Sequence, residues 1–208
     1  EKGLLTIERL NDAVIRILAL KASLKLNTYK ESNNLIPDEK KLDILKCPKH
    51  IEMARECADK SITLVKDSQK LLPITIDKFK KIRLYIIGDN EKGIINEDKI
   101  TEKFKQTLEE KGFKVDLYDN KNLNFKEIFS EGIEDLQNKF DLAIYVANVE
   151  TTSNKTTVRI DWQTFMAANA PWFVKEIPTL FISFSNPYHL IDLPMIETYI
   201  NVYSANEY

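Results

Sequence analysis

His189 and Asp192, both in the segment SNPYHLIDLP (residues 185–194), are the pair whose types and spacing could do acid–base chemistry. An imidazole works as a general acid or base when a second group holds it in position, and Asp192 is the carboxylate close to it in sequence. Three residues apart on one helical turn, the two side chains could touch. The alternative is an ordinary structural turn, and the sequence favours that interpretation.

A second polar segment, ETTSNKTTVR (residues 150–159), is long and follows directly on an apolar run. It lies where a strand of a parallel sheet is expected to end, and ligands of such sheets bind beside the carboxyl ends of the strands. Glu150, Arg159, Asn186 and His189 are therefore candidates for the rim of a site. We expect Arg159 to tie the loop down through an ion pair with Asp161.

For the other reactive groups, the sequence favours structural roles over catalytic or ligand-binding ones. The turn IGDNEKG (residues 87–93) matches neither phosphate-binding glycine pattern, so turn formation is favoured over phosphate binding. Cys47 and Cys57 lie ten residues apart along one expected helix and cannot meet, and no CxxC motif is present. His50 stands near a helix start, where a surface or capping role is ordinary. No metal site and no cofactor are expected.

Composition narrows the class of protein. The 208 residues are 43% hydrophobic and 30% charged, with a net charge of -2, so a core can form and no basic surface for nucleic acid is expected. No apolar run approaches the ~20 residues of a membrane span. No secretory signal opens the chain, which begins inside an expected helix without methionine. We expect a piece of a longer protein, and its compartment stays open.

Five apolar segments should form the scaffold that positions these residues. They are IRLYII, VDLY, DLAIYVA, TLFIS and TYINVY, at residues 82–87, 115–118, 141–147, 179–183 and 198–203. Helical patterns separate them at residues 98–111, 125–140 and 160–175, the last with Pro171 as a break, and a short helix is expected near residues 189–192.

This alternation predicts an α/β fold with a doubly wound, mainly parallel five-stranded sheet and helices on both faces. In the flavodoxin-like order 2-1-3-4-5, the crevice lies between residues 88–93 and 148–159. Before the sheet, the sequence predicts a separate helix over residues 7–26, a linker over 27–47 with one short helical turn, and a helix from Pro48 to Ser61.

Two segments of this N-terminal region resemble a known family. The motif AxxSITLVKDxxxLLP (residues 58–73) resembles the start of the C-terminal domain of glycoside hydrolase family three. ERLNDAVIRILALKxxLKL (residues 8–26) is similar to the last helix of that family's N-terminal (β/α)8 barrel. The resemblance implies a barrel helix at residues 1–26, a linker at 27–47 and the family's C-terminal α/β domain at 48–208, truncated at its end.

A third segment narrows the resemblance. SFSNPYxLxDxPxxxTYINxYSxNE (residues 183–207) resembles the β-N-acetylglucosaminidase branch of the family, in its two-domain bacterial form. In that branch the acid/base is similar to a His–Asp pair on a barrel loop. In the glucosidase branch a Glu of the loop corresponding to residues 150–159 is the acid/base, which would be Glu150. Both remain open, and turn or core roles are favoured for Asn186 and Pro187 over contact with substrate.

The barrel segment KHFPGHG and the family's nucleophilic Asp are absent from the 208 residues. The resemblance therefore implies an accessory domain of a retaining glycoside hydrolase acting on terminal β-linked sugars. Its partners would be the missing barrel and the carbohydrate substrate, with no nucleic acid and no membrane span. The fragment alone is expected to be inactive. The rival hypotheses are a non-catalytic carbohydrate-binding module and a purely structural interface domain.

Overall fold

The structure is a computed structural model and describes residues 3, 5–28, 38–88, 100–118, 131–149, 158–162 and 167–204. The chain divides into two compact units, Glu1–Met53 and Ala54–Tyr208. Within the described parts of the chain, no helix has the length and apolar character needed to cross a membrane.

The first unit is built from short helical pieces. Helix α1 (Ile7–Ser23) begins at Thr6, whose side chain accepts a hydrogen bond from Arg9 N at 3.2 Å. The 3-10 helices η1 (Leu26–Thr28) and η2 (Glu39–Ile44) follow. The single turn expected in the linker is therefore present as η2.

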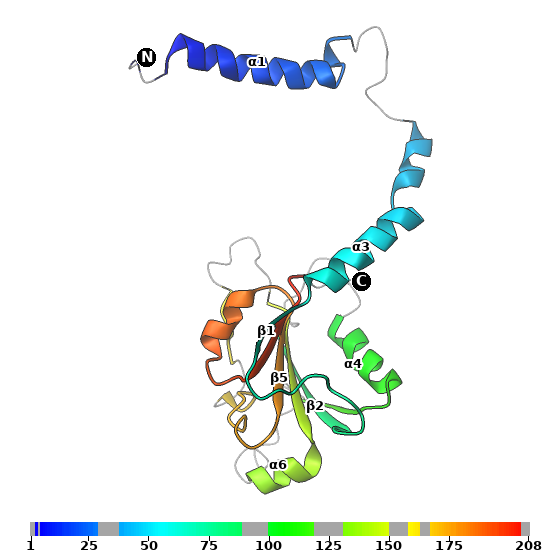
Figure 1. Cartoon of the computed structure of the whole chain (residues 1–208), viewed down its shortest axis with the longest axis vertical. Coiled ribbons are helices and arrows are strands. Elements are labelled where there is room, and N and C mark those ends of the chain that lie inside the picture. Colours follow the sequence, from blue (N-terminus) through cyan, green and yellow to red (C-terminus); the bar gives the residue numbers. More distant parts are fainter. Residues whose placement is uncertain are drawn as a thin grey trace. The chain divides into compact units, whose positions relative to one another are not determined.

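Helix α3 (Pro48–Ser61) starts at the proline, which lacks the N–H that a first turn leaves unpaired. It leads into a six-stranded sheet ordered β1-β6-β5-β4-β2-β3 (Figure 1). The strands are β1 (Thr63–Asp67), β2 (Lys81–Ile87), β3 (Lys114–Leu117), β4 (Leu142–Ala147), β5 (Thr179–Ser183) and β6 (Thr198–Asn201).

Strands β2 to β6 are parallel, and their order is the flavodoxin-like 2-1-3-4-5 that the sequence predicts. The predicted count of five strands is wrong, because β1 adds an antiparallel edge strand beside β6. Strand β1 is short and exposed over Thr63, Leu64 and Val65, and its register shifts between Leu64 and Lys66. Such a strand lacks the continuous apolar run that marks its buried neighbours.

Helices cover both faces of the sheet. Helix α4 (Ile100–Glu110) packs Phe104 and Leu108 on one face and ends before Gly112, which has φ +93° and serves as the expected C-cap. Helix α6 (Ile133–Lys139) packs Leu136 on the other face. The remainder of the helix expected over residues 125–140 lies mostly outside the described residues.

The helix expected over residues 160–175 is wrong in the described part of that range. Residues 160–162 are not helical, residue 167 is in a 3-10 conformation, and turns and bends occupy most of residues 168–177. Pro171 supplies no N–H for a helical bond, while Phe173 and Ile177 are buried in the core. These residues therefore reach the core from turns and not from a regular helix.

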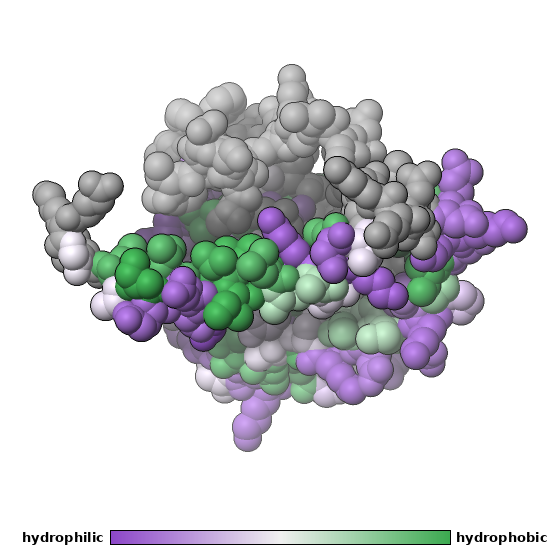
Figure 2. All heavy atoms as spheres, turned by 90° about the horizontal axis from the view of Figure 1, so that it is seen from above, coloured by the Kyte–Doolittle hydropathy of each residue, from purple (hydrophilic) through white to green (hydrophobic). Residues whose placement is uncertain are grey.

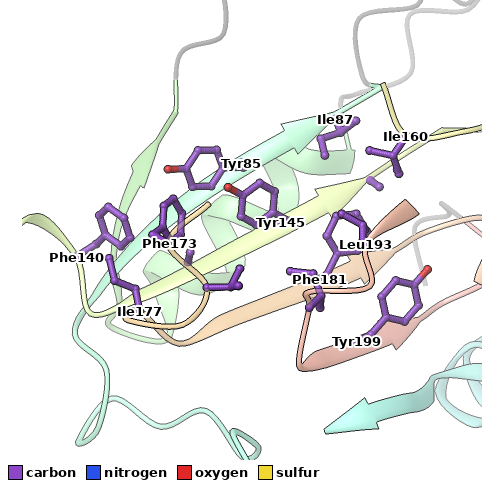
Figure 3. Close-up of a cluster of buried hydrophobic side chains, with 14 of the residues drawn as sticks. Tyr85, Ile87, Phe140, Tyr145, Ile160, Phe173, Ile177, Phe181, Leu193 and Tyr199 are labelled. Atoms are coloured by element: carbon purple, nitrogen blue, oxygen red, sulfur yellow. The ribbon is translucent and has the colours of Figure 1, made fainter. Parts of the chain in front are cut away.

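Aligned aromatic rings fix the register of the central strands (Figure 3). Tyr85, Tyr145, Phe181 and Tyr199 are direct partners across β2, β4, β5 and β6. Their ring centroids lie 4.3, 6.1 and 5.5 Å apart in that order, with nearly parallel planes. Stacked cross-strand pairs of this kind stabilise the sheet beyond simple burial.

Candidate functional site at the carboxyl ends of the strands

Connections from β2, β4 and β5 meet where these strands end. Gly88, directly after β2, has φ +90°, and a Cβ atom there would lie 2.5 Å from Asn148 O. Only glycine permits this approach of the two main chains. The residue therefore serves packing between loops, and the rest of the expected turn, residues 89–93, lies outside the described residues.

Residues 150–157 also lie outside the described residues, and Glu150 is among them. The structure describes the two ends of this connection, at Val149 and at residues 158–160. The hydrogen bonds of these stems show which side chains hold Val149 and residues 158–160.

Asp192, at the end of the 3-10 helix η4 (Pro187–Asp192), holds the second stem. Its Oδ1 accepts from Arg159 Nε at 2.6 Å and from the terminal guanidinium nitrogen as well, and its Oδ2 accepts from Ile160 N at 3.1 Å. The Asp192 side chain is 10% exposed, whereas that of Arg159 is 65% exposed. The ion pair expected between Arg159 and Asp161 is therefore wrong, since the partner comes from η4.

His189 holds the same stem from inside. Its side chain is 1% exposed, with Nε2 2.8 Å from Val158 O and Nδ1 2.9 Å from Ser183 Oγ. A carbonyl oxygen can only accept, so Nε2 carries a proton. In the neutral ring Nδ1 is an acceptor for the Ser183 hydroxyl, whose one proton also has Asn186 O as an acceptor at 2.9 Å. His189 and Asp192 thus bind different partners and share no hydrogen bond.

The first stem is held by the same segment. Ser185 Oγ donates to Val149 O at 2.7 Å. Asn186 caps η4 through its side-chain oxygen, which accepts from Tyr188 N at 2.9 Å, and its carbonyl accepts from Tyr199 OH at 3.1 Å. Asn186 therefore has a positioning role in the turn, in the place the sequence suggested for it.

Burial and pairing set the charges of this cluster. The hydrogen bond from Arg159 lowers the pKa of Asp192, against the effect of burial, and the same contact raises the pKa of Arg159. Burial lowers the pKa of His189 and raises that of Tyr199 to about 12. At neutral pH the cluster therefore holds an ionised Asp192 and a neutral His189.

The side chains of this cluster can position the main chain, because their polar groups are already bonded within the chain. Asp192 is committed to Arg159 and Ile160, and both ring nitrogens of His189 are occupied. Over the described ranges, no group of three His, Cys, Asp or Glu side chains could hold a metal ion. Cys47 and Cys57 are free, and His50 is exposed on α3.

Sequence reasoning brought forward Arg159, Asn186 and His189, and the structure gathers them around η4. It missed Ser183, Ser185 and Tyr199 as members of the same network. The alternation of Ser183 and Ser185 at the end of an apolar strand was a usable signal, because it places two polar side chains on the same face at the carboxyl end of that strand.

Comparisons show that the chain is similar to parts of carbohydrate-active enzymes. A β-N-acetylglucosaminidase/β-glucosidase of Cellulomonas fimi is 40% identical over 206 residues, which are 98% of this chain and 36% of that protein. The solved structure of a β-glucoside phosphorylase, BglX, is 43% identical with a TM-score of 0.77, and covers 99% of this chain and 35% of its own. No family model matches the chain.

A β-N-acetylglucosaminidase of glycoside hydrolase family 3 from Paenibacillus shares the fold at 19% identity, with a TM-score of 0.50 over 98% of this chain and 36% of its own. The fold and the matches together show an α/β domain like one part of these enzymes. Over nearly its whole length the chain is similar to one part of these enzymes, which agrees with the C-terminal domain of glycoside hydrolase family three that its sequence resembles. It spans about a third of the length of these relatives.

Proposed function

We propose that this chain is the accessory C-terminal domain of a retaining glycosidase that removes terminal β-linked sugars, chiefly N-acetylglucosamine residues. The observation that carries the proposal is the 40% identity to a β-N-acetylglucosaminidase/β-glucosidase across nearly the whole chain. The stems at residues 149 and 158–160 support it, because they lie at the carboxyl ends of the parallel strands, where ligands of this fold class bind.

Catalysis on this proposal depends on a partner domain. A retaining glycosidase needs two carboxyl groups about 5–5.5 Å apart across one sugar ring. The carboxylate that the structure places in the site cluster, Asp192, is occupied by Arg159 and Ile160. The nucleophile would come from a barrel domain in the longer protein, and the carbohydrate would bind between the two.

Helix α1 supports a barrel partner. Its large apolar side chains are exposed, among them Ile7 at 67%, Leu10 at 52% and Leu18 at 56%. Figure 2 shows hydrophobic side chains gathered along one side of this helix, beside hydrophilic ones. An unpartnered apolar face of this kind marks an interaction surface. On our proposal residues 1–26 are the last helix of that barrel, and residues 27–47 link it to the α/β domain.

Assays of two forms of the protein test the proposal. The isolated 208-residue chain should leave aryl β-N-acetylglucosaminides and aryl β-glucosides uncleaved above background. The longer protein that includes the barrel should cleave the first substrate. Turnover by the isolated chain would overturn the accessory role, and an inactive, folded longer protein would overturn the glycosidase proposal.

Glu150→Gln in the longer protein distinguishes the branches of the family. If the acid/base is a His–Asp pair on the barrel, the substitution should leave the chemical step nearly unchanged, which is our expectation. If Glu150 is the acid/base, kcat should fall by roughly 10²–10⁴-fold, the usual contribution of such a group. The measurement is kcat with aryl glycosides whose leaving groups differ in pKa.

Phosphorolysis is a second candidate reaction. It is favoured by one observation, the 43% identity to solved structures of a β-glucoside phosphorylase. Phosphate in the assay would then yield a sugar 1-phosphate in place of the free sugar. Quantifying both products with and without phosphate separates the two reactions in a single experiment.

A non-catalytic role is tested on the isolated chain. Calorimetric titration with N-acetylglucosamine oligomers should give no binding if the domain acts only together with the barrel. Binding by the isolated chain would support a carbohydrate-binding module, and a longer protein without activity or binding would leave a structural interface domain.

A further inference from the structure

One ten-residue segment holds both stems of the polar loop, Val149 before residues 150–157 and residues 158–160 after them. From residues 183–192, Ser185 binds the main chain of Val149, while His189 and Asp192 bind residues 158–160. These stems are about ten residues apart in sequence, and the residues that hold them lie 31 to 36 residues further along the chain than their partners. The two ends of the loop are therefore fixed by one common element.

The holding segment is itself fixed to the sheet. Phe184 N donates to Ala147 O at 2.9 Å, and Asn186 N donates to Ser183 Oγ at 3.1 Å. Tyr199, from β6, donates to the carbonyl of Asn186. Residues 183–192 thus extend the ordered hydrogen bonding of β4, β5 and β6 beyond the strand ends.

We propose that residues 183–192 act as a brace that fixes Val149 and residues 158–160 beside the sugar site, with His189 and Asp192 as positioning residues. The inference rests on the proposed function for the sugar site, while the brace itself is a property of this chain. Three of the hydrogen bonds from these side chains join main-chain atoms of Val149, Val158 and Ile160, so the brace fixes the main chain of both stems. Catalytic sites lose up to about 10²-fold in rate when a contacting group is displaced by roughly 1 Å.

The chain offers graded variants of the brace. Asp192→Ala removes the acceptors of Arg159 and Ile160 together, whereas Asp192→Asn keeps one oxygen that can accept from Ile160 N. Arg159→Ala removes only the ion pair, from an exposed side chain that is easily replaced. Lys175→Ala is the matched control, since it breaks another single ion pair, to Glu197 at 2.7 Å, at the opposite ends of the strands.

Hydrogen exchange of the Ile160 amide in the 208-residue chain tests the brace directly. Asp192→Ala should speed this exchange at least about 10-fold, with a smaller change in Asp192→Asn and Arg159→Ala and none in Lys175→Ala. Amides of β2, β4 and β5 should keep their wild-type rates. Unchanged exchange at Ile160 in Asp192→Ala would overturn the brace, as would equal acceleration throughout the sheet.

Kinetics of the longer protein test the positioning role. At unchanged thermal stability, Arg159→Ala and Asp192→Asn should lower kcat/KM for the β-linked sugar about 10-fold. The control Lys175→Ala should keep the wild-type value. Wild-type kinetics in Asp192→Ala, with the Ile160 amide exchanging fast, would overturn the positioning role alone. Absence of activity in the wild-type longer protein would overturn the proposed function, and the exchange result would still decide the brace.

Discussion

Aspartates bind main-chain amides at both ends of the parallel strands. Those at the amino ends join strands to one another, whereas the one at the carboxyl ends binds a loop stem. At the amino ends, Asp141 accepts from Lys80 N and Lys81 N, each at 2.9 Å, and so joins β4 to the start of β2. Asp67 accepts from Leu71 N and from the Thr198 hydroxyl, and so joins β1 to the start of β6. At the carboxyl ends, Asp192 holds the stem of a polar loop.

The same chemistry therefore has two consequences. The amino-end carboxylates fix segments that are continuous with strands and with the buried Leu71, so their loss should lower the stability of the whole sheet. Asp192 fixes a connection at the surface, so its loss should release a loop while the sheet persists. The amino ends of the strands therefore carry carboxylates that stabilise the fold, whereas the carboxyl ends carry one that positions the candidate site.

The largest expected effect is that of Asp67→Ala. It removes acceptors from Leu71 N at 2.9 Å, Leu72 N at 3.4 Å and Thr198 Oγ1 at 2.8 Å. Loss of a charged acceptor that leaves partly buried donors unpaired should lower the free energy of unfolding by about 3 kcal/mol. Urea unfolding followed by circular dichroism measures this change.

Asp67→Asn is the control for that substitution. One oxygen remains to accept, so the loss should be smaller, and exchange of the Ile160 amide should stay at the wild-type rate at low urea. A loss of less than about 0.5 kcal/mol in Asp67→Ala would contradict the stabilising role of the amino end.

Asp192→Ala gives the contrasting measurement. Although it also removes three hydrogen bonds, its main partner Arg159 is largely exposed, so we expect a loss of about 1 kcal/mol in the free energy of unfolding. The urea midpoint relative to Asp67→Ala is the measurement. A loss equal to that of Asp67→Ala would show that the loop stem supports the sheet, and would remove the distinction between the two ends.

The sequence was sufficient for the parallel strands, because each is a buried apolar run and their alternation with helices restricts the topology. It was insufficient for β1, which is half-exposed and pairs antiparallel with a strand more than 130 residues away. Local periodicity likewise could not predict that Arg159 pairs with Asp192, since the two are 33 residues apart. Asp161 was the nearer acid, and only the return of the chain through η4 brings the actual partner.

Asn201 provides a further test, at the carboxyl end of β6. Its side chain is 0% exposed, and within the described part of the chain neither amide atom has a hydrogen-bond partner. Asn201→Leu has a similar volume and removes the buried polar atoms, so it should raise the free energy of unfolding by about 1 kcal/mol. Thermal and urea unfolding measure it. A loss of stability would show that the amide is satisfied in solution and belongs to the polar network of the site.

The smallest expected effect is the pH dependence of the brace. Burial lowers the pKa of His189 in the folded chain, although the charge of Asp192 nearby acts in the opposite direction. An unfolded histidine titrates near 6.5, so below that pH the unfolded chain binds more protons than the folded one. The free energy of unfolding should therefore decrease as the pH falls through about 6.5 toward the lower pKa of the folded state.

His189→Gln should flatten this part of the stability profile, measured by urea unfolding at several pH values. His50→Gln, at an exposed site on α3, is the matched control. The carboxylate of Asp192, whose pKa is also lowered, loses its contribution only at more acidic pH, below the usual value near 3.9, so the two windows stay separate. An unchanged slope in His189→Gln would show that protonation of His189 leaves the brace intact.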